Sequence, residues 1–168
     1  MADLSPTFSE KTVMESGFDP SEKYERGLAL RKAGLFKHAI EEFEQAAASR
    51  RHALKAYAQI GLCHKSRGRH EEAVSAFRKA LQCSPASVKE TVQILYVLGR
   101  TLETLGRIAE TLEAYRWIRR EDPAYRDVEQ RIQQLSTRRI SSHRTPPAQP
   151  SWVGGVLRSW QDLLRASK

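Results

Sequence analysis

Three segments of the sequence resemble one another, and each begins with a glycine. The segments are GLFKHAIEEFEQAA from Gly34, GRHEEAVSAFRKAL from Gly68 and GRIAETLEAYRWIR from Gly106. The first two glycines are 34 residues apart and the next two are 38 residues apart. Another glycine lies seven residues before each of them, at positions 27, 61 and 99. A unit that recurs at such a period buries its apolar face against neighbouring copies, so the sequence predicts an array of repeats.

Each segment is predicted to form the second helix of a helix pair. In the first segment the apolar residues recur at i, i+1, i+4 and i+7, which is the spacing of one buried helical face; they are Ala39, Ile40, Phe43 and Ala46. The earlier glycine of each unit lies inside the first helix, where it costs about 1 kcal/mol relative to alanine. We therefore expect the backbones of paired helices to approach closely there, and the aromatic residues to fill the space between neighbouring pairs.

Local signals predict where the helices begin and end. Asp19-Pro20-Ser21-Glu22 supplies an N-cap acid, a proline at the first helical position and a glutamate at the offset of a capping box. The glycines at 34, 68 and 106 are expected to end the first helices in a left-handed conformation. The four extra residues of the third unit predict one added helical turn around Ser87–Thr91. After Pro123, a helix with a single apolar stripe is expected to cover the last pair; the stripe is Tyr125, Val128, Ile132 and Leu135.

On these residues the chain resembles the tetratricopeptide repeat family over roughly residues 20–123. The second unit matches the family pattern best, through Tyr57, Ile60, Gly61, Gly68, Ala73, Phe77, Ala80 and Pro85. The first unit has Lys23 and Arg26 where large apolar residues are usual, and the third has Thr111 at the small-residue position. The resemblance implies an all-α fold, a right-handed α-solenoid of three helix pairs (20–53, 54–87 and 88–123) plus a capping helix at 124–135.

The resemblance also implies that the first helices line a concave groove that binds partners. The positions that match are Tyr24, Leu28, Arg31, Ala58, Leu62, Lys65, Tyr96 and Arg100. This mixture of apolar and basic residues suits a peptide or an amphipathic helix with acidic flanks. Family members that clamp a C-terminal carboxylate use Lys and Asn in the first repeat, but Tyr24 and Leu28 occupy those positions here, which argues against such a clamp. We therefore expect a non-enzymatic adaptor or scaffold for a protein partner.

The segments outside the predicted array differ from it in composition. Residues 1–19 are expected to be a flexible leader, and residues 136–151 a linker rich in Pro, Ser and Arg. The tail at 152–168 carries apolar residues at helical spacing: Trp152, Val156, Trp160, Leu163 and Leu164. Because so short an amphipathic segment cannot bury this face by itself, it packs on the array, binds a partner or lies on a membrane surface. Peripheral membrane association through this tail is the alternative to the adaptor hypothesis.

The net charge of +8 is unevenly distributed. Residues 136–168 contain six Lys or Arg residues and one acid, Asp162, whereas the bases of the predicted array alternate with many acids. Nucleic acid is therefore not the expected partner. No basic start followed by an apolar run occurs at the N-terminus, and no run of 18 apolar residues occurs in the sequence, so we expect a cytoplasmic location. Pairing of two arrays into a homodimer is left open.

Residue types with reactive side chains do not form a known motif. The five histidines and two cysteines lack the spacing of a zinc site, and no phosphate-binding glycine loop occurs. Cys63 and His64 are adjacent, but neighbours on a helix point about 100° apart and cannot face each other. Both cysteines are expected to be small buried hydrophobes. The sequence therefore predicts neither an enzyme nor a bound metal or cofactor.

Overall fold

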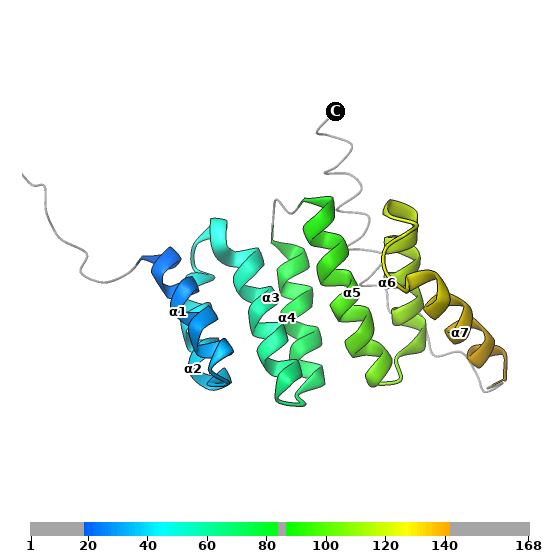
Figure 1. Ribbon diagram of the computed structural model, residues 1–168, viewed down its shortest axis with the longest axis horizontal. Coiled ribbons are helices and arrows are strands. Elements are labelled where there is room, and N and C mark those ends of the chain that lie inside the picture. Colours follow the sequence, from blue (N-terminus) through cyan, green and yellow to red (C-terminus); the bar gives the residue numbers. More distant parts are fainter. Residues whose placement is uncertain (1–18, 84–86, 142–168) are drawn as a thin grey trace, which may run out of the picture.

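The computed structural model describes residues 19–83 and 87–141, with the side chains of residues 138–141 left out. Within these ranges the chain forms helices and short connections, and the helices stand side by side in chain order (Figure 1). They are α1 (Pro20–Lys32), α2 (Phe36–Ala46), α3 (Arg50–Ser66), α4 (His70–Gln82), α5 (Val88–Thr104), α6 (Ile108–Glu121) and α7 (Val128–Ser141). Helices α1 and α2, α3 and α4, and α5 and α6 pack as pairs, and α7 packs on α6. The expected all-α fold of three pairs and a seventh helix is confirmed.

A glycine in the first helix of each pair lies against an aromatic ring from the second helix. The three contacts are Gly27–Phe43, Gly61–Phe77 and Gly99–Tyr115. A Cβ added to Gly61 would lie only 2.5 Å from Cε1 of Phe77, so no other residue fits without a shift of the ring. We expected contact between backbones here and rings between neighbouring pairs. The structure instead places each ring on the bare backbone of its own pair.

Each first helix ends in the same hydrogen-bonded turn. The glycines at 34, 68 and 106 have φ values of 78°, 72° and 71°, in the left-handed region that glycine adopts without strain. Just after Gly68, the backbone N–H of Arg69 donates to the carbonyl oxygen of His64 at 2.9 Å, which closes the helix end. The bonds from Leu35 to Leu30 and from Arg107 to Leu102 are equivalent. The prediction that these glycines end the first helices is confirmed.

Helix α1 begins at the predicted residue, but its capping differs in one detail. The Asp19 side chain accepts a hydrogen bond from the backbone N–H of Ser21 at 2.9 Å, and Pro20 is the first helical residue. Glu22 does not complete a capping box. Its carboxylate lies 3.4 Å from the guanidinium of Arg26 instead, because the two residues are one turn apart on the exposed surface of the helix.

The capping box is found at the start of α5. The Ser87 hydroxyl accepts from the Glu90 backbone N–H at 3.2 Å, and the Glu90 carboxylate accepts from the Ser87 backbone N–H at 3.0 Å.

The expectation of an added turn at Ser87–Thr91 is wrong, because α3 and α5 both contain 17 residues. The extra residues lie in α4, which has 13 residues where α2 has 11, and in the connection that follows it. The second pair also begins earlier than expected, at Arg50 instead of 54.

Replacing Ser87 by alanine is expected to lower the free energy of unfolding by about 1 kcal/mol at neutral pH, the usual effect of losing an N-cap side chain. The backbone hydrogen bond from Ser87, together with its hydroxyl, holds the pKa of Glu90 below its ordinary value. A carboxyl with a depressed pKa stabilises the fold above its unfolded-state pKa, and this contribution is lost as pH falls through the folded-state value. Urea unfolding at neutral pH and near pH 3 should therefore show a smaller difference between S87A and wild type in acid. Ser87→Thr, which keeps the cap, serves as the control, and a difference that grows in acid would contradict the assignment.

The apolar core consists of two clusters of unequal size. The smaller cluster joins the first two pairs through Ala39, Ile40, Phe43, Ala46, Ala56, Ile60, Cys63 and Ala76. The larger cluster runs from Leu54 in α3 to Leu135 in α7. Helix α1 contributes one buried residue, Gly27, to the described core. Its Lys23 and Arg26 instead lie 3.4 Å and 3.5 Å from the carboxylate of Glu42, as suits the polar outer face of a terminal repeat.

Helix α7 covers the last pair with the predicted stripe but has different bounds. Val128, Ile132 and Leu135 are all buried against the larger cluster. The helix begins four residues later than the expected 124–135 segment and ends six residues later, at Ser141. It continues because no proline or glycine occurs between 136 and 141, so the first six residues of the expected linker are helical. The leader at 1–18 and the tail anchor from Trp152 to Leu164 lie outside the described residues, so membrane association through the tail stays a prediction.

Candidate functional site

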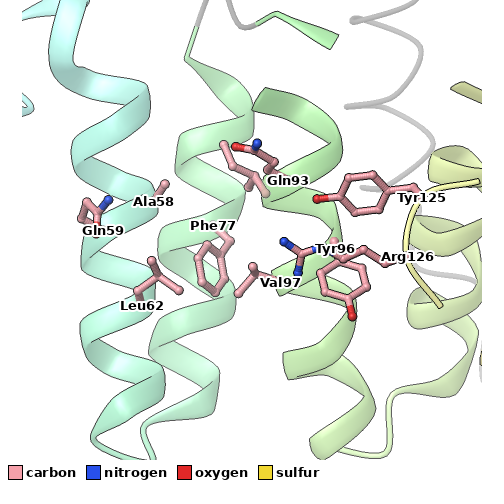
Figure 2. Close-up of a pocket in the computed structure, with 10 residues that line it drawn as sticks. Ala58, Gln59, Leu62, Phe77, Gln93, Tyr96, Val97, Tyr125 and Arg126 are labelled. Atoms are coloured by element: carbon pink, nitrogen blue, oxygen red, sulfur yellow. The ribbon is translucent and has the colours of Figure 1, made fainter. Parts of the chain in front are cut away.

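An open pocket with a volume of about 390 Å³ lies between the first helices of the second and third pairs (Figure 2). We call it the α3–α5 pocket. Its lining comprises Ala58, Gln59 and Leu62 from α3, Phe77 from α4, Gln93, Ile94, Tyr96 and Val97 from α5, and Tyr125 and Arg126 from the turn before α7. This volume lies within the range of about 300–1,000 Å³ that is usual for ligand sites.

Helical spacing explains which side chains line the pocket. Ala58 and Leu62 are one turn apart on α3, and Gln93 and Val97 are one turn apart on α5, so each pair shares a face of its helix. Phe77 reaches the pocket from the second helix behind them (Figure 2). The walls are therefore apolar, with the amide groups of Gln59 and Gln93 added to them.

Tyr96 is fixed at one end of the pocket by the turn that precedes α7. Its hydroxyl donates a hydrogen bond to Oδ1 of Asp127 at 2.8 Å, and its ring meets the ring of Tyr125 edge-on, with centroids 5.6 Å apart. The guanidinium carbon of Arg126 lies 4.7 Å from the centroid of the Tyr96 ring. With only 8% of its surface exposed, Tyr96 shapes the pocket and offers a partner little surface of its own.

Arg126 has an unusual backbone conformation. Its φ of 48° makes it the one non-glycine residue with a positive φ in the described part of the chain. A left-handed conformation costs an ordinary residue about 1–2 kcal/mol, so the surrounding contacts must hold it. The guanidinium lies 4.7 Å from the ring centroid of Tyr96 and 5.4 Å from that of Tyr125. Both distances are within the range of cation–π attraction.

Arg131 of α7 pairs with two acids near the pocket. Its Nε lies 2.7 Å from Oδ2 of Asp127, and its Nη1 lies 2.9 Å from Oε2 of Glu103. Burial alone would raise the pKa of Asp127, but the Tyr96 hydroxyl and the Arg131 guanidinium together hold that pKa below its ordinary value. Glu103 also accepts a hydrogen bond from the Tyr115 hydroxyl at 3.2 Å. These contacts fix α7 on the last pair, and Arg131 offsets one of the two negative charges.

Two further cations, Lys65 and Arg100, lie near each other on α3 and α5. Burial, and then the charge of Arg100, lower the pKa of Lys65. Arg100 approaches Glu103 only loosely, with Nε 3.9 Å from the carboxylate, and that carboxylate is already held by Arg131. Lys65 and Arg100 therefore place two positive charges near each other on these helices.

The structure brings together only part of the predicted groove. Ala58, Leu62 and Tyr96 line the α3–α5 pocket, while the remaining five do not; these are Tyr24, Leu28, Arg31, Lys65 and Arg100. Tyr24 is linked to the pocket through Gln59, whose Nε2 lies 3.5 Å from the tyrosine hydroxyl. Its ring packs on Phe43, with centroids 5.6 Å apart, and Leu28 packs on the same small cluster.

Sequence reasoning missed most of the lining residues. Gln59, Gln93, Ile94 and Val97 lie beside the predicted positions on the same two helices, and a wider helical face would have included them. Tyr125 was expected only as part of the apolar stripe of the covering helix. No sequence pattern identified Arg126, because it reaches the pocket from a turn that lies beyond the repeated units.

Cys63 and His64 are adjacent reactive side chains in the described part of the chain. Cys63 is fully buried, and burial raises the pKa of its thiol, which makes it a poor nucleophile. Burial is also the main cause that lowers the pKa of His64. Among the described residues, no group of three or more His, Cys, Asp or Glu side chains could hold a metal ion. None of the helices in the described ranges has both the length and the apolar character needed to cross a membrane.

The comparison with protein families agrees with this geometry. The family model described as tetratricopeptide repeat matches residues 24–88. Residues 24–88 consist of tetratricopeptide repeats. The match covers nearly all of the first two helix pairs, and the third pair has the same glycine–aromatic contact and the same glycine turn as the first two tetratricopeptide pairs. No curated protein matches the chain.

The tetratricopeptide pairs determine where the pocket lies. Side chains from α3 and α5 face the same space, with Phe77 of α4 between them (Figure 2). Tetratricopeptide repeats indicate interactions with other proteins, and the α3–α5 pocket offers apolar side chains in a concave setting.

Proposed function

We propose that the chain is a non-enzymatic interaction module that binds a segment of a protein partner in the α3–α5 pocket. The observation that supports this most strongly is the pocket itself, an open apolar space of about 390 Å³ between the first helices of two adjacent tetratricopeptide pairs. Residues in such a concave, partly apolar setting bind side chains of a partner by removing apolar surface from water.

The polar groups of the pocket suit a peptide backbone. Gln93 is exposed and offers an amide that both donates and accepts, which matches the N–H and C=O groups of an extended segment. The Gln59 amide is engaged within the chain, since its Nε2 donates to the Tyr24 hydroxyl at 3.5 Å and its Oε1 is buried.

Filling the pocket is expected to weaken partner binding about tenfold or more without unfolding the chain. Replacing Ala58 by phenylalanine places a ring where a partner side chain would lie, since Ala58 is half-buried in the pocket wall. Crosslinking in the native cell, followed by mass spectrometry, would identify partners whose yield falls about tenfold or more. That fall is the loss expected when one apolar anchor of about 1.5 kcal/mol is removed.

The matched control is Ala48→Phe, which adds the same ring at an exposed residue between α2 and α3. Thermal unfolding of both variants checks that each still folds. Partners that are lost with A58F and kept with A48F support the proposal. Equal yields of every partner from wild type and A58F would contradict it.

A further inference from the structure

Three cations, Lys65, Arg100 and Arg126, lie around the α3–α5 pocket, and among the described residues only Arg100 approaches an acid, Glu103 at 3.9 Å. In the described ranges neither Lys65 nor Arg126 forms an ion pair, and the nearest charge that acts on Lys65 is that of Arg100. Arg131 pairs with both Asp127 and Glu103, so these three residues together carry one negative charge. Lys65, Arg100 and Arg126 carry three positive charges, and 3 − 1 leaves a net charge of +2 around the pocket.

Arg126 is held so that its guanidinium stays at the pocket wall. Its guanidinium carbon lies 4.7 Å from the ring centroid of Tyr96 and 5.4 Å from that of Tyr125. Cation–π attraction to these rings uses no hydrogen-bond acceptor, so the guanidinium N–H groups can still donate to the two oxygens of a carboxylate. The left-handed φ of 48° directs this side chain from the turn back over α5 (Figure 2).

We propose that the α3–α5 pocket binds an acidic segment of a protein partner. A large apolar side chain of that segment enters the space beside Leu62, Phe77 and Val97, and the carboxylate of a neighbouring Asp or Glu pairs with Arg126. Lys65 and Arg100 add attraction for further acids along the same segment. This inference rests on the proposed function, because it names the chemistry of the partner for the same pocket.

Charge complementarity favours this occupant over the tail of the chain itself. Residues 152–168 contain large apolar side chains, but their charged residues are Arg158, Arg165 and Lys168 against Asp162. A segment with a positive net charge is repelled by Arg126 and by the Lys65 and Arg100 pair. An acidic segment is instead attracted by these three cations.

Selection from a random peptide library displayed on phage, with the full chain as bait, tests this inference. We expect enrichment of peptides in which a large apolar residue lies within about one turn of Asp or Glu. One enriched peptide is then synthesised, and its affinity for purified variants is measured by fluorescence anisotropy. Arg126→Asn removes the charge but keeps a residue type that tolerates the left-handed conformation, and it should weaken binding about 10- to 100-fold.

Three controls make the result specific. Lys37→Gln changes the net charge equally at an exposed site on α2 and should leave affinity unchanged. Replacing the peptide's acid by its amide should weaken binding to wild type as much as R126N does. Combining the two changes should weaken binding little further than either change alone, because both remove the same contact.

The outcomes separate this inference from the proposed function. Some selected peptides could lose affinity for A58F and yet contain no acid, or bind R126N as well as wild type. That result would overturn the acidic-segment inference alone. Enrichment of apolar peptides rich in Lys and Arg would overturn it as well, and would indicate the tail as occupant. Failure to select any peptide that A58F weakens would overturn both.

Discussion

Replacing Phe77 by alanine is expected to lower the free energy of unfolding by about 3–5 kcal/mol, the usual effect of removing a fully buried aromatic ring. Phe77 is only 1% exposed and belongs to the larger core cluster. Its ring also lies directly on the backbone of Gly61, which has no side chain to fill the resulting space. Urea unfolding followed by circular dichroism measures the change, and a loss below about 1 kcal/mol would contradict the assigned packing.

Gly61, which lies against the Phe77 ring, provides a control for this prediction. In an ordinary helix, alanine in place of glycine stabilises by about 1 kcal/mol. In wild type, Gly61→Ala should do the opposite, because the new Cβ would lie 2.5 Å from the Phe77 ring and force it to move. In the F77A background the ring is gone, so the same substitution should stabilise. If Gly61→Ala has the same sign in both backgrounds, the ring contact is not the reason for the glycine.

Replacing Glu110 by glutamine is expected to lower the free energy of unfolding by about 2 kcal/mol, because it removes the buried anion that Arg78 and Arg107 share, while Arg107 keeps its exposed contact with Glu71 at 3.1 Å. Glu110 is 6% exposed, its Oε2 lies 2.8 Å from Nη2 of Arg78, and its Oε1 lies 2.7 Å from Nε of Arg107. The expected loss is smaller than for a fully buried ion pair, since both guanidinium groups keep some contact with solvent. Urea unfolding at low ionic strength measures it.

An exposed glutamate provides the matched comparison. Glu41→Gln makes the same chemical change on the surface of α2 and should alter stability by less than about 0.5 kcal/mol. Adding Arg78→Met to E110Q should recover part of the lost stability, because it removes one of the two cations that share the Glu110 carboxylate in wild type. A Glu110→Gln variant as stable as Glu41→Gln would show that the Arg78–Glu110–Arg107 cluster does not hold α4 and α6 together.

The repeated part of the fold could be predicted because the same physical constraint recurs in each unit. The turn glycines need a left-handed φ, and the helix glycines lie where another backbone or ring comes close, so their spacing determines the pairs. The error at the third unit has a local cause. The length of the unit showed that four residues were added, but a count of residues cannot show that they lie in α4 and the connection after it. The capping box of Ser87 and Glu90 sets the start of α5.

The pocket was less predictable than the pairs. Ala58, Leu62 and Tyr96 were found because a helical face places them on the same side as their equivalents in other units. Arg126 was missed because its position depends on long-range contacts with Tyr96 and on the turn before α7. Such contacts join residues that are distant in sequence and do not follow a repeat period. The same holds for Arg131, whose partner Glu103 lies two helices earlier.

The weak attachment of α1 has a consequence for how the array unfolds. This helix buries Gly27 alone and is otherwise held by half-buried side chains and by ion pairs with Glu42 that remain in contact with water. The cost of separating it is therefore small compared with the cost of opening the cluster that runs from α3 to α7. Among the described helices, we therefore expect local opening to begin at α1 while the helices that form the α3–α5 pocket stay folded. The pocket is thus separated from the described helix that buries the fewest residues.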